Sequence, residues 1–129
     1  MAIALVSLAS CSGDGPKLHP VRGSVFFNEK AAEGATVVFH LIGGESTAPS
    51  PSGTVKADGT FSLRTHPHGE GAPEGDYIVL ITWYPPNARE LDNPKNQLPN
   101  RYASHSESPL RATVKKGSNE LEPFRLTMK

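Results

Sequence analysis

Gly75-Asp76-Tyr77-Ile78-Val79-Leu80-Ile81-Thr82-Trp83 is the stretch of this 129-residue chain that decides its fold. Every second position from Tyr77 to Trp83 is large and apolar or aromatic, which places these side chains on one face of a β-strand. Ile78 and Leu80 are also apolar, so we expect the opposite face to be partly covered. The stretch therefore predicts a central strand of a sheet.

Four other segments show the same two-residue period and are separated by turn residues. They are Val21, Gly23, Val25 and Phe27; Ala35, Val37, Phe39 and Leu41; Phe61, Leu63 and Thr65; and Leu110, Ala112 and Val114. No stretch repeats its apolar residues at the 3.6-residue period of an amphipathic helix over a useful length. Short strands joined by glycine and proline turns are typical of an all-β sandwich or barrel. We expect a sandwich of about seven antiparallel strands.

Three short segments have the composition of tight turns. Asp58-Gly59 is the clearest, because these two residues readily adopt the positive φ values that tight hairpins require. Glu33-Gly34 and Lys116-Gly117-Ser118-Asn119 predict two similar turns. These turns separate neighbouring strands of the expected sandwich.

The last apolar segment departs from a regular strand. Leu121, Phe124 and Leu126 are apolar, but their spacing changes around Pro123. Proline cannot donate a hydrogen bond to a ladder, so it is confined to edge strands and bulges. We therefore predict an edge strand or a bulge near Pro123.

Two stretches lie outside the strand pattern. Residues 43–52 form a loop of Gly, Ser and Pro, and residues 85–109 form a much longer loop rich in Pro, Asn and Ser. Loops of this length are usually functional, ordered by packing, or disordered. We expect the longer loop to dock on the sandwich through Leu91, Leu98 and Tyr102.

Tyrosine and arginine dominate interface hot spots. We therefore choose exposed Tyr84, Arg89, Arg101 and exposed Tyr102 as the candidate partner contacts.

The N-terminus carries a motif for membrane attachment. Leu8-Ala9-Ser10-Cys11 follows a short apolar run and is similar to a bacterial lipobox, in which the chain is cut before a cysteine that then carries lipid. The run is about half of the ~20 residues that a spanning helix needs. We expect a signal segment at 1–10, lipidated Cys11 with a tether at 11–17, and one domain at 18–129. The alternative is a frayed apolar terminus with an incidental cysteine, since no Lys or Arg precedes Leu8.

Composition limits the classes of function. Thirteen Lys and Arg residues balance thirteen Asp and Glu residues, so the basic surplus of a nucleic-acid-binding protein is missing. Twelve Gly and twelve Pro are scattered at turn-like positions rather than repeated. The single cysteine excludes an internal disulfide. The length suits one domain with one core.

Four motifs in a fixed order resemble the carboxypeptidase regulatory-like, transthyretin-like β-sandwich domains. They are Val21-x-Gly23-x-Val25, Gly34-Ala35-x-Val37-Val38-Phe39, Ala57-Asp58-Gly59-Thr60-Phe61 and Gly75-Asp76-Tyr77-x-Val79. Small envelope lipoproteins of planctomycete-type bacteria, with a lipobox before one such domain, are the most similar. The resemblance covers nearly the whole chain after Pro16. It implies an Ig-like sandwich with no zinc site, cofactor or peptidase activity.

Two aromatic residues have expected structural roles. Tyr77, two residues after Gly75, is placed like the tyrosine that pins a β-sandwich corner through its hydroxyl. Trp83 is expected to contribute the largest single apolar burial, and its indole N–H requires a partner.

Catalytic or metal chemistry is the rival interpretation. His66 and His68 could converge with the other histidines on a metal ion such as zinc, which needs three or four ligands. Pro67 between them, however, places them in a loop. The transthyretin-like fold is also that of an enzyme, 5-hydroxyisourate hydrolase, whose chain ends Tyr-Arg-Gly-Ser. Here only Arg125 matches that ending. We therefore expect no catalytic residues.

The combined expectation is a non-catalytic envelope lipoprotein that faces the periplasm or the exterior. Its role would be adhesion or scaffolding, with a membrane contact through the lipid and a protein or glycan partner on its loops. Ser12, rather than Asp, follows the cysteine and favours the outer membrane.

Overall fold

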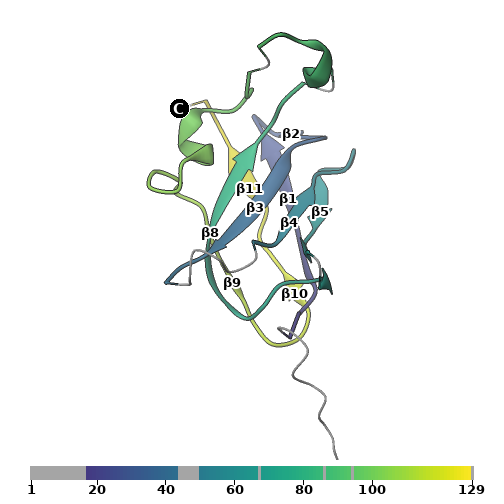
Figure 1. Cartoon of the computed structure of the whole chain (residues 1–129), viewed down its shortest axis with the longest axis vertical. Helices are drawn as coiled ribbons and strands as arrows, with labels where there is room; N and C mark the ends of the chain where they lie inside the picture. Colours follow the sequence, from purple (N-terminus) through teal and green to yellow (C-terminus); the bar gives the residue numbers. More distant parts are fainter. Residues whose placement is uncertain (1–16, 44–49, 67, 86, 94, 129) are drawn as a thin grey trace, which may run out of the picture.

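The computed structural model describes residues 17–128, apart from 44–49, 67, 86 and 94, and it is an all-β sandwich (Figure 1). Its strands are β1 (Val21–Phe27), β2 (Lys30–Ala31), β3 (Thr36–Leu41), β4 (Ser52–Thr54), β5 (Thr60–Ser62), β6 (Arg64–Thr65), β7 (Gly69–Glu70), β8 (Gly75–Thr82), β9 (Arg111–Val114), β10 (Asn119–Glu120) and β11 (Phe124–Leu126). Two 3-10 helices, η2 (Ala88–Glu90) and η3 (Asn100–Ala103), lie in the long loop. The predicted fold class is confirmed.

The expected seven strands correspond to the longer segments of this fold. β5 and β6 form one segment interrupted at Leu63, and β10 and β11 form another interrupted at residues 121–123. β2 and β7 contain two residues each. Without these two short strands, and with each interrupted segment counted once, seven strands remain.

The first sheet is built around β1. β2 and β5 pair with β1 in antiparallel fashion, whereas β10 and β11 pair with it in parallel. The sandwich is therefore not antiparallel throughout, because the first and last long segments run side by side in the same direction. Val21 pairs with Asn119 and Val25 pairs with Phe124, so the C-terminal segment holds one residue more than β1 between these pairs. This extra residue is the bulge predicted near Pro123.

The second sheet has the strand order β7-β6-β4-β3-β8-β9. β8 lies between β3 and β9 and pairs with both in antiparallel fashion, so the predicted central strand is confirmed. Ile78 and Leu80 on its outer face are half-buried, as expected.

The core lies between the two sheets and consists of the period-two residues. Phe39 and Tyr77 from the second sheet are fully buried with ring centroids 5.5 Å apart. Phe61 and Phe124 from the first sheet are stacked with centroids 6.3 Å apart. Burial of side chains of this size contributes about 1.5–3 kcal/mol each. The inward faces inferred from the alternating pattern are therefore the faces that pack.

The Asp58-Gly59 turn closes a hairpin that connects the sheets. The Lys56 N–H donates to the Thr60 carbonyl at 2.8 Å, and Gly59 has a φ of 90°. The Asp58 carboxylate accepts hydrogen bonds from the Thr60 N–H at 3.0 Å and hydroxyl at 2.7 Å. These bonds hold the pKa of Asp58 below its ordinary value. One arm is β4 in the second sheet, and the other begins as β5 in the first.

Tyr77 forms the expected corner. Its hydroxyl donates to the Pro73 carbonyl at 2.6 Å, four residues upstream, and its side chain is buried. Burial raises the pKa of Tyr77 to about 12, because the charged phenolate would lose its hydration. The bond fixes the segment that leads into β8.

Trp83 finds its expected hydrogen-bond partner but is not fully buried. Its indole N–H donates to the Glu33 carbonyl at 2.7 Å, and its ring meets Phe27 edge to face at 6.0 Å. The side chain is only half-buried. The largest fully buried side chains are Tyr77, Phe39 and Phe61, and Trp83 is not among them. The reason is its place just past the end of β8, at the rim of the core.

Candidate functional site

Asn96, nearly halfway along the long loop, holds it against the end of β8. The Asn96 side-chain oxygen accepts hydrogen bonds from the backbone N–H of Trp83 at 2.8 Å and of Leu98 at 3.2 Å. The Gln97 N–H donates to the Trp83 carbonyl at 2.7 Å. Leu98 is buried in the core, as expected. The loop is thus anchored by backbone bonds and by an apolar contact.

Tyr102 anchors the middle of the loop instead of facing solvent. Only 5% of its surface is exposed, so the expectation of an exposed Tyr102 is wrong. Its hydroxyl accepts a hydrogen bond from the Thr127 N–H at 3.2 Å, and Arg101 Nη2 lies 3.2 Å from the same oxygen. η3 therefore joins β8 to the residues that follow β11, near the C-terminus in Figure 1.

Arg101 and Thr127 also set the ionisation of Tyr102. Burial raises the pKa of the Tyr102 hydroxyl, but hydrogen bonds from Thr127 and Arg101 lower it more, so the net pKa lies below its ordinary value. The Arg101 guanidinium is 4.7 Å from the centre of the Tyr102 ring and donates to the Thr127 carbonyl at 3.0 Å. Arg101, a candidate partner contact, is therefore half-buried and engaged within the fold.

The end of the loop is fixed by Ser108. The buried Ser108 hydroxyl donates to the Val79 carbonyl at 2.6 Å and accepts from the Leu110 N–H at 3.2 Å. Arg111 Nη1 donates to the Ser108 carbonyl at 2.9 Å. The loop therefore returns to the edge of β8 before β9 begins.

The exposed side chains of this loop region include one large aromatic, one arginine and one leucine. Tyr84 is 46% exposed, and Arg89 on η2 is exposed, as the sequence predicted. Leu91 is 42% exposed, so the expectation that it docks on the sandwich is wrong. Tyr84, Arg89 and Leu91 are defined here as the loop surface.

The histidines do not converge as the metal hypothesis requires. His66 and His68 are exposed on the turn between β6 and β7, and the His68 N–H donates to the Thr65 carbonyl at 2.7 Å. His19 lies elsewhere, with its Nδ1 accepting a hydrogen bond from the Gly117 N–H at 3.2 Å. In the part of the chain that the structure describes, no three His, Cys, Asp or Glu side chains are arranged to hold a metal ion.

A different histidine pair does meet. His40 on the outer face of β3 and His105 in the long loop have ring centroids 5.5 Å apart in an edge-to-face arrangement. The pKa of His40 is lowered, first by burial and second by the charge of His105. The Ser50 hydroxyl lies 3.5 Å from His40 Nδ1. The pairing requires the loop to cross the outer sheet face, so it could not be read from the sequence.

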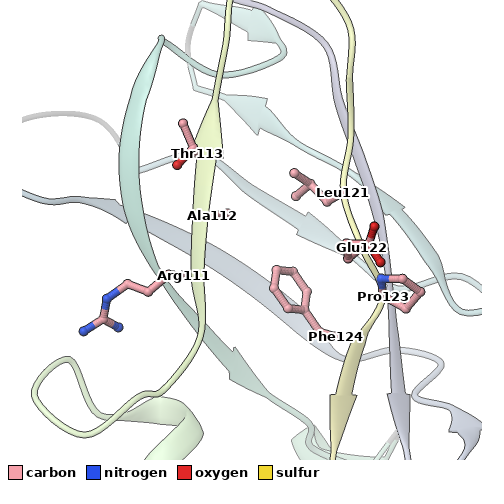
Figure 2. A pocket seen from close by; sticks show the side chains of 7 residues that line it. All are labelled: Arg111, Ala112, Thr113, Leu121, Glu122, Pro123 and Phe124. Atoms are coloured by element: carbon pink, nitrogen blue, oxygen red, sulfur yellow. The ribbon is translucent and has the colours of Figure 1, made fainter.

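The second surface feature is a pocket of about 270 Å³ beside β9, defined here as the edge groove. It is lined by Arg111, Ala112, Thr113, Leu121, Glu122, Pro123 and Phe124. Figure 2 shows Leu121 and Phe124 pointing toward β9, with Ala112 opposite them and the Arg111 side chain directed away. No motif in the sequence predicts this pocket. Its only signal was the interrupted spacing at Pro123.

The predicted lipidation site, Cys11, and the signal segment lie outside the described residues, as do residues 44–49 of the shorter loop. Across the described ranges, no helix is long and apolar enough to cross a membrane. Comparison with known proteins finds no matching family model, curated protein or solved structure.

Proposed function

We propose that this chain is a lipid-anchored binding or scaffold protein of the bacterial cell envelope, built on a carboxypeptidase regulatory-like sandwich and without catalytic activity. The observation that carries the proposal is the long loop anchored on the β-sandwich, beside which Tyr84, Arg89 and Leu91 are exposed. Contact residues on loops supported by a scaffold are the usual arrangement in binding modules. Tyrosine and arginine are the residues that such surfaces use most for affinity.

The lipid anchor has its own test, in which Cys11→Ser is compared with Ser12→Ala. We expect the wild-type chain and Ser12→Ala to enter the detergent phase and to take up radiolabelled fatty acid. Cys11→Ser should remain in the aqueous phase without label, because it lacks the thiol that receives lipid. Retention of Cys11→Ser in membranes would count against the anchor.

The binding surface is tested with the full Cys11→Ser chain and purified envelopes of the bacterium that produces it. We expect saturable binding that falls about tenfold or more in the double variant Tyr84→Ala, Arg89→Ala, as for hot-spot residues. Glu74→Ala is the matched control, since Glu74 is exposed just before β8, at the opposite end of that strand from Tyr84. Protease treatment of the envelopes separates a protein partner from a glycan. Equal binding by both variants would refute the loop surface as the contact site.

A further inference from the structure

β9 has one unpaired edge. The Val79 N–H donates to the Leu110 carbonyl at 3.1 Å, and hydrogen-bonded pairs alternate along an antiparallel ladder. In the observed register, Ala112 and Val114 therefore direct their peptide groups toward β8. The N–H and C=O groups of Arg111 and Thr113 face away from β8. Within the described ranges, β9 pairs with no strand other than β8.

The edge groove lies directly beside these unpaired groups. Ala112 lies on its β9 side, and Leu121, Pro123 and Phe124 line it from the C-terminal segment (Figure 2). At this level the bulge interrupts the ladder that β10 and β11 form with β1, so the C-terminal segment is not a regular strand here. A strand added to β9 would present every second side chain to the groove. The lining favours an apolar side chain at that position.

The exposed charges that the β9 segment itself contributes on the outer side of the same edge are basic, and Glu74 and Asp76 lie beside them on the β8 side. Arg111 and Lys115 are exposed there, and Thr113 between them donates its hydroxyl to Asp76 at 2.7 Å. Two copies of β9 paired through their unpaired groups would bring Arg111 beside or diagonal to Arg111 or Lys115 of the second copy. Like charges at these positions are destabilising. The charges therefore favour a partner with acidic residues over a second copy of this chain.

We propose that β9 binds an extended peptide segment of another protein, which adds to the sheet and places an apolar side chain in the edge groove. On the outer face, acidic residues of the peptide lie beside Arg111 and Lys115, and an uncharged residue lies beside Thr113, next to Asp76. The segment thus has an acidic residue at each end, an uncharged residue between them and an apolar residue at the position that faces the groove. Strand addition derives its affinity from main-chain hydrogen bonds and its specificity from alternate side chains. The inference rests on the proposed binding role and names a second contact surface for it.

The test is a selection from a random-peptide display library on the full Cys11→Ser chain, followed by affinity measurement with the strongest peptide. We expect bound peptide to slow hydrogen exchange at the Arg111 and Thr113 amides. Thr113→Pro removes one edge N–H, and Thr113→Val is its matched control, since both lose the hydroxyl. Proline is tolerated on edge strands, and its loss of one hydrogen bond should weaken binding about fivefold relative to valine.

A second variant keeps the test decisive if Thr113→Pro fails to fold. Ala112→Leu fills part of the groove and should weaken binding about tenfold, while thermal melting confirms that the variant is folded. Equal affinity for the proline and valine variants, or for Ala112→Leu and the parent chain, would overturn the proposal. Slowed exchange that requires self-association would assign the edge to a second copy instead. The Thr113→Pro and Ala112→Leu variants could leave peptide binding unchanged while the double variant Tyr84→Ala, Arg89→Ala still lowers envelope binding. That outcome would reject the β9 inference and leave the proposed function in place.

Discussion

Replacement of Tyr77 by phenylalanine measures how much the corner contributes to the sandwich. The change removes the 2.6 Å hydrogen bond to the Pro73 carbonyl and keeps the ring that packs against Phe39. A buried acceptor left without its donor costs about 1–3 kcal/mol. For a domain of this size, each kcal/mol corresponds to a fall in melting temperature of about 4 °C or more. We therefore expect a loss of several degrees.

Urea unfolding followed by fluorescence is a direct assay, because Trp83 is the single tryptophan and is only half-buried. Tyr84→Phe is the matched control: its side chain is exposed, and it should change the free energy of unfolding by less than about 0.5 kcal/mol. Unfolding of Tyr77→Phe at the wild-type urea concentration would refute the structural role assigned to the hydroxyl.

The same variant gives a pH test with a defined sign. The pKa of Tyr77 rises from 10.0 to about 12 on folding, so the unfolded chain loses this proton first as pH increases. The contribution of the hydroxyl to stability is therefore complete below pH 10 and is lost progressively toward pH 12. The stability advantage of wild type over Tyr77→Phe should shrink across this window. An advantage that stays constant or grows there would contradict the argument.

Phe39→Ala should lower the free energy of unfolding by about 3–5 kcal/mol, because Phe39 is fully buried between the sheets; a melting curve like that of wild type would show that the inward face is wrongly assigned. His105→Ala should raise the pKa of His40 toward its ordinary value, because it removes the neighbouring charge and uncovers the ring. An NMR titration of His40 measures this shift, and a further decrease would exclude the pairing.

The parts of the fold predicted from sequence are those set by local periodicity. Tyr77, Val79 and Ile81 alternate with half-covered residues, and the strand proves to be central. Gly59 adopts the positive φ that its turn requires. Pro123 marks a real change of register. In each case the local residue types determine the backbone conformation or the face of the strand that is buried. The prediction therefore does not depend on contacts with distant segments.

The missed features depend on contacts between distant segments. The parallel pairing of β1 with the C-terminal segment has no local signature. Tyr102 is as suitable for a surface as for a core, and only its bonds to Thr127 and Arg101 decide the outcome. The tight turn at Asn28 and Glu29 also escaped prediction, because it uses positive φ at two residues other than glycine.

The parallel neighbours of β1 have a consequence for the order of folding. β1 comes from the beginning of the domain, yet it pairs with β10 and β11, nearly a hundred residues later. Ladders between such distant segments form slowly, because a long loop must close first. The first sheet therefore cannot be completed on the ribosome before β11 has emerged. If such a chain crossed a membrane through a narrow channel, its first sheet could be completed only after β11 had emerged on the far side.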